Sequence, residues 1–214
     1  MDQNKRLCGY YNYTVVLTYL GMLIGFTGIM FAMEGAYRQA IICLMTSGVC
    51  DMFDGTVAST KQRDMREKKF GIQIDSLSDL ICFGALPALF TYHIGGKHYI
   101  TFLASCFYLL CTLIRLAYFN VLEEERQETE TGKRKWYLGL PVTSAALILP
   151  LFFEVGGGVP SMAGTIFSAL LMIMALAFIL PIKIKKPYLV GKIGIIFMGF
   201  IEFIALLLGL GLDV

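Results

Sequence analysis

The chain has 214 residues, of which 57% are hydrophobic and 16% are charged, and its mean hydropathy is +0.67. So apolar a composition excludes an ordinary soluble domain of this size and indicates a protein that crosses a membrane several times. The formal net charge of +2 is small, and we expect no nucleic-acid partner.

Seven apolar segments can be drawn along the chain, over about 13–33, 37–54, 71–94, 99–121, 140–155, 159–181 and 190–212. The second and the fifth are short for a span of ~20 residues, so each is expected to be tilted, broken or partly outside the membrane. The pattern predicts an all-α fold: a polytopic integral membrane bundle of about six to eight transmembrane helices. We expect residues 1–214 to form a single domain.

Basic residues are unevenly distributed over the connections between these segments. They gather before the first segment, in the loop 59–70, and in the connections 122–139 and 182–189, whereas the opposite side carries only Arg38, at the start of the second segment, and Lys97. Cytosolic loops of membrane proteins carry an excess of lysine and arginine. We therefore expect a cytosolic N-terminus and a functional site that opens to the cytosol. We also expect the membrane to be that of a prokaryotic cell.

Four aspartates stand close to a basic loop between the second and third segments: Asp51, Asp54, Asp75 and Asp79. Residues three or four apart share one face of a helix, so each helix presents two carboxylates on one side. Carboxylates in apolar helices are costly unless a cation compensates them. Oxygen ligands suit a hard divalent ion, so the pattern predicts a Mg²⁺ or Mn²⁺ site.

Small residues follow the first aspartate pair. Gly55 and Ala58 would let a ligand approach the backbone of the second helix closely. Beside the carboxylates, this indicates room for a nucleotide or a pyrophosphate.

The whole pattern, Asp51-x-x-Asp54-Gly55-x-x-Ala58 and then Gly71-x-x-x-Asp75-x-x-x-Asp79, resembles the signature of the CDP-alcohol phosphotransferase family. The resemblance implies that the four aspartates bind divalent metal, as two ions, and that Asp79 is also the general base on the acceptor hydroxyl. It further implies that the cytidine diphosphate group contacts Asp51, Gly55, Ala58, Ser59, Gly71 and Asp75.

The sequence departs from the family pattern after Ala58. The family usually has arginine at the next position, where this chain has Ser59, and the gap to Gly71 is longer than usual. Losing a fixed cation beside a pyrophosphate should cost affinity or rate. Either Lys61 or Arg63 could reach in from the longer loop; otherwise the enzyme is weakened or altered.

Three flanking stretches resemble the phosphatidylserine synthase branch of the family. They are Asp75–Ala88, Arg115–Asn120 and Gly139–Pro141. This resemblance implies transfer of a phosphatidyl group from CDP-diacylglycerol to L-serine, with phosphatidylserine and CMP as products, and a homodimer among membrane lipids. Arg115, with Asn120, is a candidate to bind the carboxylate of serine or a lipid phosphate.

Two alternatives remain open at this point. Another acceptor alcohol, such as glycerol 3-phosphate or an inositol phosphate, would use the same chemistry with extra basic residues, which the loop from Lys61 to Lys69 could supply. A catalytically silent family member or a cation transporter would produce no CMP. Transporters are often built from repeated halves, and the sequence has no convincing repeat.

Overall fold

The computed structural model describes residues 8–129, 136–156, 160–185 and 189–208, and most of them are helical. The helices are α1 (Tyr13–Met33), α2 (Tyr37–Ala58), α3 (Met65–Asp79), α4 (Leu86–Ile94), α5 (Tyr99–Thr129), α6 (Ala145–Gly156), α7 (Pro160–Ile179) and α8 (Leu189–Leu208). A π-helical segment, η1 (Leu80–Ala85), joins α3 to α4, and a 3-10 turn, η2 (Val142–Ser144), precedes α6. The predicted all-α membrane bundle is confirmed.

Four helical stretches are long and apolar enough to cross a membrane: Tyr13–Met33, Tyr37–Ala58, Met65–Ile94 and Tyr99–Glu125. Shorter apolar helices follow at Val142–Phe153, Ala163–Ile179 and Gly199–Leu208. Large apolar side chains such as Leu23, Phe26 and Ile173 are exposed on the outside of the bundle. A soluble protein would bury such side chains, so these helices are suited to a lipid environment and the chain is an integral membrane protein.

The helices extend beyond the apolar segments that predicted them. Helix α2 ends at Ala58 instead of near residue 54, α3 begins at Met65 instead of near residue 71, and α5 continues to Thr129. Hydropathy marks only the apolar part of a helix, whereas backbone hydrogen bonding continues into polar sequence. Asp64 explains the early start of α3, because its side chain accepts a hydrogen bond from the backbone N–H of Glu67 at 2.6 Å.

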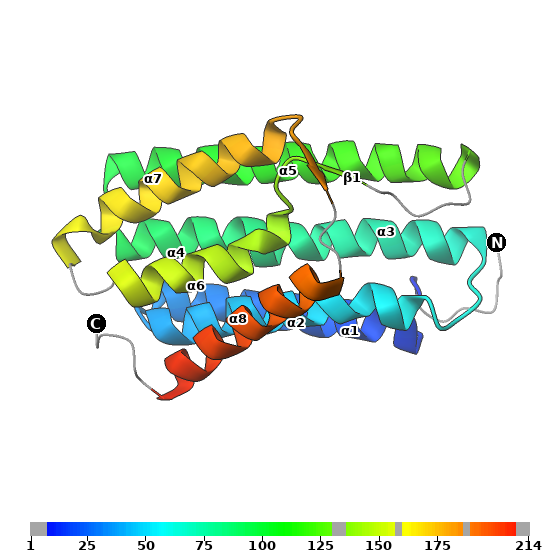
Figure 1. Cartoon of the computed structure of the whole chain (residues 1–214), viewed down its shortest axis with the longest axis horizontal. Helices are drawn as coiled ribbons and strands as arrows, with labels where there is room; N and C mark the ends of the chain where they lie inside the picture. The colour runs from blue at the N-terminus through cyan, green and yellow to red at the C-terminus, as the bar shows by residue number, and fades with distance from the viewer. Residues whose placement is uncertain (1–7, 130–135, 157–159, 186–188, 209–214) are drawn as a thin grey trace.

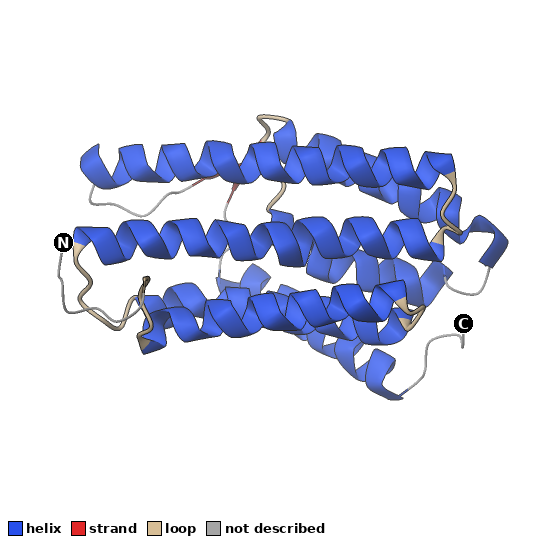
Figure 2. Cartoon of the chain, turned by 180° about the vertical axis from the view of Figure 1, so that it is seen from behind, coloured by secondary structure: helices blue, strands red, loops and turns tan. Residues whose placement is uncertain are grey.

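The rod formed by α3, η1 and α4 lies in the middle of the bundle (Figure 1). Helices α1 and α2 flank it on one side and α5 on the other, and α7 crosses α5 (Figure 1). The view from behind shows the same three long layers, nearly parallel (Figure 2). The start of α1, the α2–α3 connection and the end of α5 all lie at one end of the bundle (Figure 1).

Glycines on α1 allow unusually close packing against its neighbours. A Cβ atom built at Gly25 would lie 2.4 Å from the Sγ atom of Cys82, and one at Gly21 would lie 3.1 Å from the Cβ atom of Cys50. Small residues at helix contacts let backbones approach closely inside a membrane. Helix α1 is thereby held against both α2 and the central rod, near the aspartates that those elements carry.

In the π-helical segment directly after Asp79, a backbone carbonyl accepts a hydrogen bond from another helix. Pro87 has no backbone N–H and cannot donate to the carbonyl of Phe83, four residues earlier. The hydroxyl of Tyr108, on α5, donates to that carbonyl at 2.7 Å, and the Tyr108 side chain is completely buried. This bond joins α5 to the central rod one turn beyond Asp79.

We expect Tyr108→Phe to lower the free energy of unfolding by about 1–3 kcal/mol, because the Phe83 carbonyl would lose this hydrogen bond in a buried site. Thermal unfolding of the detergent-purified protein measures the change. Tyr118→Phe is the matched control, since Tyr118 lies on the same helix and is 55% exposed. Equal stabilities for the two variants would contradict the role given to the Tyr108 hydroxyl.

Two short strands were not predicted from the sequence. Strand β1 (Trp136–Leu138) pairs antiparallel with β2 (Lys183–Lys185), and the backbone N–H of Gly139 donates to the carbonyl of Ile182 at 2.7 Å. Three-residue strands give no hydropathy pattern of their own.

Many of the basic residues that predicted the membrane orientation lie outside the part of the chain that the structure describes. These are residues 1–7 and the side chains of residues 126–138 and 183–196. The orientation predicted from the basic residues there therefore stays a prediction.

Candidate active site

Two helices bring the four aspartates to one place. Asp51 and Asp54 lie near the end of α2, and Asp75 and Asp79 lie in the last turns of α3. One carboxylate oxygen from each of Asp51, Asp54 and Asp75 lies within 4.8 Å of the others. The carboxyl groups of Asp51 and Asp79 are within hydrogen-bonding reach of each other, as are those of Asp54 and Asp75. The structure thus gathers residues that are separated by a loop in the sequence.

This donor set fits a divalent cation. Carboxylates so close together repel one another unless positive charge lies among them. All of the charged atoms that could coordinate the cation are carboxylate oxygens, which hard ions such as Mg²⁺ and Mn²⁺ prefer as ligands. A cavity of about 10 Å³, the size of a single water molecule or ion, is lined by all four aspartates. Asp51, Asp54 and Asp75 could therefore hold a metal ion, with Asp79 beside them.

Thr18, on α1, also belongs to this site, and the sequence analysis missed it. Its hydroxyl donates to the Oδ2 atom of Asp54 at 3.2 Å, and the side chain is buried. It lies one helical turn after Thr14, which is also buried. Two threonines four apart in the first half of a mostly apolar helix are a sequence signal that could have identified this face of α1.

We expect Thr18→Val to raise the half-saturating metal concentration by about tenfold, because a hydrogen bond to a charged group is lost without loss of volume. The rise of the melting temperature over a Mn²⁺ titration measures the change. Thr27→Val is the matched control: Thr27 is exposed on the same helix and its hydroxyl donates only to the carbonyl of Leu23, at 2.8 Å. An unchanged metal requirement in Thr18→Val would remove Thr18 from the site.

A larger cavity of about 420 Å³ opens beside the carboxylates. Asp54 and Asp75 form part of its wall, together with the predicted nucleotide contacts Gly55, Ala58 and Gly71. A Cβ atom built at Gly55 would meet no heavy atom within 4 Å, so the backbone of α2 is open to the cavity there. The cavity offers a ligand both acidic groups and a bare helix surface.

The structure brings some predicted contacts into this cavity and leaves others outside its wall. Asp51 and Asp79 line the smaller cavity instead. Ser59 is exposed at the end of α2, where its hydroxyl donates to the carbonyl of Thr56 at 2.7 Å. Asn120, on α5, accepts a hydrogen bond from the hydroxyl of Ser76 at 2.6 Å. Asn120 thus supports the helix turn that carries Asp75, and a contact with substrate stays a prediction for both Ser59 and Asn120.

Arg115 is buried away from the lining of both cavities. Its guanidinium donates to the carbonyl of Phe178, at 2.8 Å, and to that of Gly139, and lies 4.5 Å from the centre of the Phe119 ring. These contacts join α5 to the end of α7 and to the turn after β1. They account for a buried arginine without a substrate, and its predicted contact with serine or a lipid phosphate stays untested.

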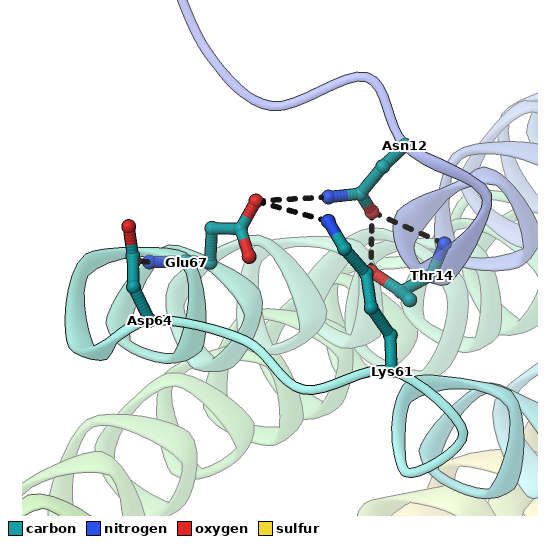
Figure 3. Close-up of polar contacts among 5 residues, drawn as sticks. All are labelled: Asn12, Thr14, Lys61, Asp64 and Glu67. Atoms are coloured by element: carbon teal, nitrogen blue, oxygen red, sulfur yellow. Dashed lines mark hydrogen bonds and ion pairs between the residues drawn. The ribbon is translucent and has the colours of Figure 1, made fainter.

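Loop 59–64, which contributes Arg63 to the wall of the larger cavity, is anchored by a polar network (Figure 3). The Oε1 atom of Glu67 accepts hydrogen bonds from Lys61, at 3.2 Å, and from the side-chain amide of Asn12, at 3.3 Å. The Oδ1 atom of Asn12 in turn accepts from the backbone N–H and the hydroxyl of Thr14, which lines the cavity (Figure 3). The network ties the loop and the start of α3 to the start of α1.

Comparison with known proteins agrees with this geometry. A family model described as CDP-alcohol phosphatidyltransferase matches residues 11–184. The chain is 35% identical over 152 residues, 65% of its length, to the CDP-diacylglycerol–serine O-phosphatidyltransferase of Saccharomyces cerevisiae. It is 32% identical over 73% of its length to the archaetidylserine synthase of Methanothermobacter thermautotrophicus. A CDP-diacylglycerol–serine O-phosphatidyltransferase of Helicobacter pylori is 29% identical over 66% of the chain.

The aligned parts are 54%, 64% and 56% of these three relatives' own lengths. The chain therefore spans little more than half of the curated relatives that it matches. The matched residues nevertheless contain both cavities and all four aspartates.

Proposed function

The chain belongs to the CDP-alcohol phosphatidyltransferase family, and on that premise we propose that it transfers the phosphatidyl group of CDP-diacylglycerol to L-serine, giving phosphatidylserine and CMP. The observation that carries the proposal is the meeting of four carboxylates from α2 and α3 beside a cavity with open backbone at Gly55. We take residues 1–214 as one domain with this activity.

The names of the relatives support serine as the acceptor more strongly than they support any particular lipid as the donor of the transferred group. The names of the relatives differ in the lipid, phosphatidyl in some and archaetidyl in another, but all contain serine. Arg63 and Lys68 in the cavity wall are the feature that favours a phosphorylated acceptor instead. Glycerol 3-phosphate and an inositol phosphate are therefore the alternatives to test.

Each carboxylate is given a role by its position. Asp51, Asp54 and Asp75, with Asp79 as a fourth ligand, would hold divalent metal, Mg²⁺ or Mn²⁺ and as two ions, which when bound supplies charge neutralisation for the pyrophosphate. Asp79 lies next to Asp51 but outside that group of three. It takes the proton from the serine hydroxyl as the serine oxygen bonds to the phosphorus next to diacylglycerol. The bond from that phosphorus to the bridging oxygen breaks, and CMP leaves with the electron pair.

We also propose that the site faces the cytosol of a prokaryotic cell. The α2–α3 connection, which contains Lys61 and Arg63, lies at the same end of the bundle as the start of α1, and both segments contribute residues to the wall of the larger cavity. Positive charge favours the cytosolic side. A homodimer is proposed from the family resemblance alone.

Release of CMP tests the proposed function directly. The detergent-purified protein is given CDP-diacylglycerol, Mn²⁺ or Mg²⁺, and one acceptor at a time. We expect release with serine and only background release with glycerol 3-phosphate or an inositol phosphate. Release only with another alcohol would overturn serine as acceptor, and no release with any acceptor would overturn the activity.

A further inference from the structure

Arg63 lies in the wall of the larger cavity, although it belongs to the loop between α2 and α3. Its side chain is half-buried, and its Nη1 atom lies 2.9 Å from the position that a Cβ atom would occupy at Gly71. Any side chain at position 71 would therefore crowd the guanidinium. The missing side chain of Gly71 leaves room for Arg63 on the cavity side of α3.

Lys61, two residues earlier in the same loop, is held elsewhere. Its ammonium group pairs with Glu67 at 3.2 Å, outside the lining of the larger cavity (Figure 3). The loop is further anchored by the hydrogen bond between the hydroxyls of Thr60 and Tyr13, at 3.1 Å, and by the N-cap at Asp64. With both flanks held, the segment directs Arg63, and not Lys61, at the cavity.

Within the part of the chain that the structure describes, Arg63 has no hydrogen-bond or ion-pair partner. A half-buried guanidinium with five N–H donors normally has acceptors, because leaving such donors unsatisfied costs free energy. The open space beside it belongs to a cavity that also has Asp54 and Asp75 in its wall. A ligand with both anionic oxygens for Arg63 and a metal-binding group for the carboxylates would satisfy both walls.

We propose that Arg63 binds a phosphate group of the cytidine diphosphate donor and supplies the fixed cation that position 59 lacks. The proposal rests on the proposed function in taking cytidine diphosphate as the ligand. Guanidinium matches the geometry of a phosphate with two parallel hydrogen bonds, whereas an ammonium group acts as a point charge. Ser59 is exposed with its hydroxyl bonded to its own helix, and a serine side chain has no positive charge to offer a phosphate.

Binding of CDP and of cytidine, each in the presence of Mn²⁺, tests the contact without any turnover. We expect Arg63→Gln to weaken CDP binding by about tenfold or more, because a charge-assisted hydrogen bond is lost, and to leave cytidine binding unchanged. Arg63→Lys should lie between the wild type and Arg63→Gln. Arg66→Gln is the matched control, since Arg66 is exposed and lies outside the cavity wall.

Steady-state kinetics then separate the donor from the acceptor. In Arg63→Gln the KM for CDP-diacylglycerol should rise while the KM for serine stays the same; a rise for serine alone would assign Arg63 to the acceptor and overturn the proposal. Equal CDP affinity in the wild type and Arg63→Gln would also overturn it. A wild type that binds CDP but releases no CMP would instead overturn the proposed function. A wild type that binds no CDP would overturn both.

Discussion

Asp79→Asn is expected to lower the rate of CMP release by about 10²–10⁴-fold, the usual contribution of a positioned general base. Asparagine keeps the size of the side chain but cannot accept the proton of the acceptor hydroxyl. Because Asp79 lies outside the group of three carboxylates whose oxygen atoms are within 4.8 Å of one another, kcat should fall by a larger factor than the half-saturating metal concentration rises. CMP release at saturating serine and a Mn²⁺ titration measure both quantities.

Asp64→Asn is the matched control for this variant. Asp64 is exposed and caps α3, and asparagine caps helices as well as aspartate does, so activity should be retained. If metal binding in Asp79→Asn falls by as large a factor as the rate, the main role of Asp79 is to bind the metal and not to act as the general base. Wild-type kcat in Asp79→Asn would remove the residue from the chemistry.

The second large effect is expected from the metal itself. Chelation with EDTA should abolish CMP release, and Mn²⁺ or Mg²⁺ should restore it. Bound metal should also stabilise the fold, by about 2.7 kcal/mol at a concentration one hundred times its dissociation constant, since it relieves repulsion among the folded carboxylates. Thermal unfolding with and without Mn²⁺ detects this stabilisation independently of activity.

Asp54→Asn should reduce the Mn²⁺-dependent rise of the melting temperature, because one of three clustered ligand atoms is lost. Asp64→Asn again serves as control and should show the full rise. A rise of the same size in Asp54→Asn and the wild type would place the metal somewhere else. Activity that survives complete chelation would exclude a metal-dependent reaction.

Much of the site could be predicted because its residues follow helical spacing. Asp51 and Asp54, three apart, and Gly71, Asp75 and Asp79, four apart, define faces of two helices by their spacing alone. Two helices joined by a short loop pack side by side, so the four carboxylates could be expected to meet. The helices themselves were predictable from apolar segments of membrane-spanning length.

Contacts between distant segments could not be predicted in this way. Nothing in the spacing of α1 states that Thr18 reaches Asp54, since the contact depends on how closely the glycines of α1 let that helix approach. Arg115 was a plausible substrate contact by sequence, whereas its guanidinium donates to carbonyl groups on segments far along the chain. The β1–β2 pairing likewise joins residues that are remote in sequence.

By itself the sequence determined the membrane class, the order of the helices and the identity of the acidic residues, because hydropathy and helical periodicity are local properties. The tertiary structure alone decided which basic residue of the α2–α3 loop enters the cavity. Lys61 and Arg63 are equivalent candidates by position and charge, but Glu67 lies within reach of Lys61 and the bare face of Gly71 lies beside Arg63. That choice depends on the packing of α1, α2 and α3 together, which no local pattern encodes.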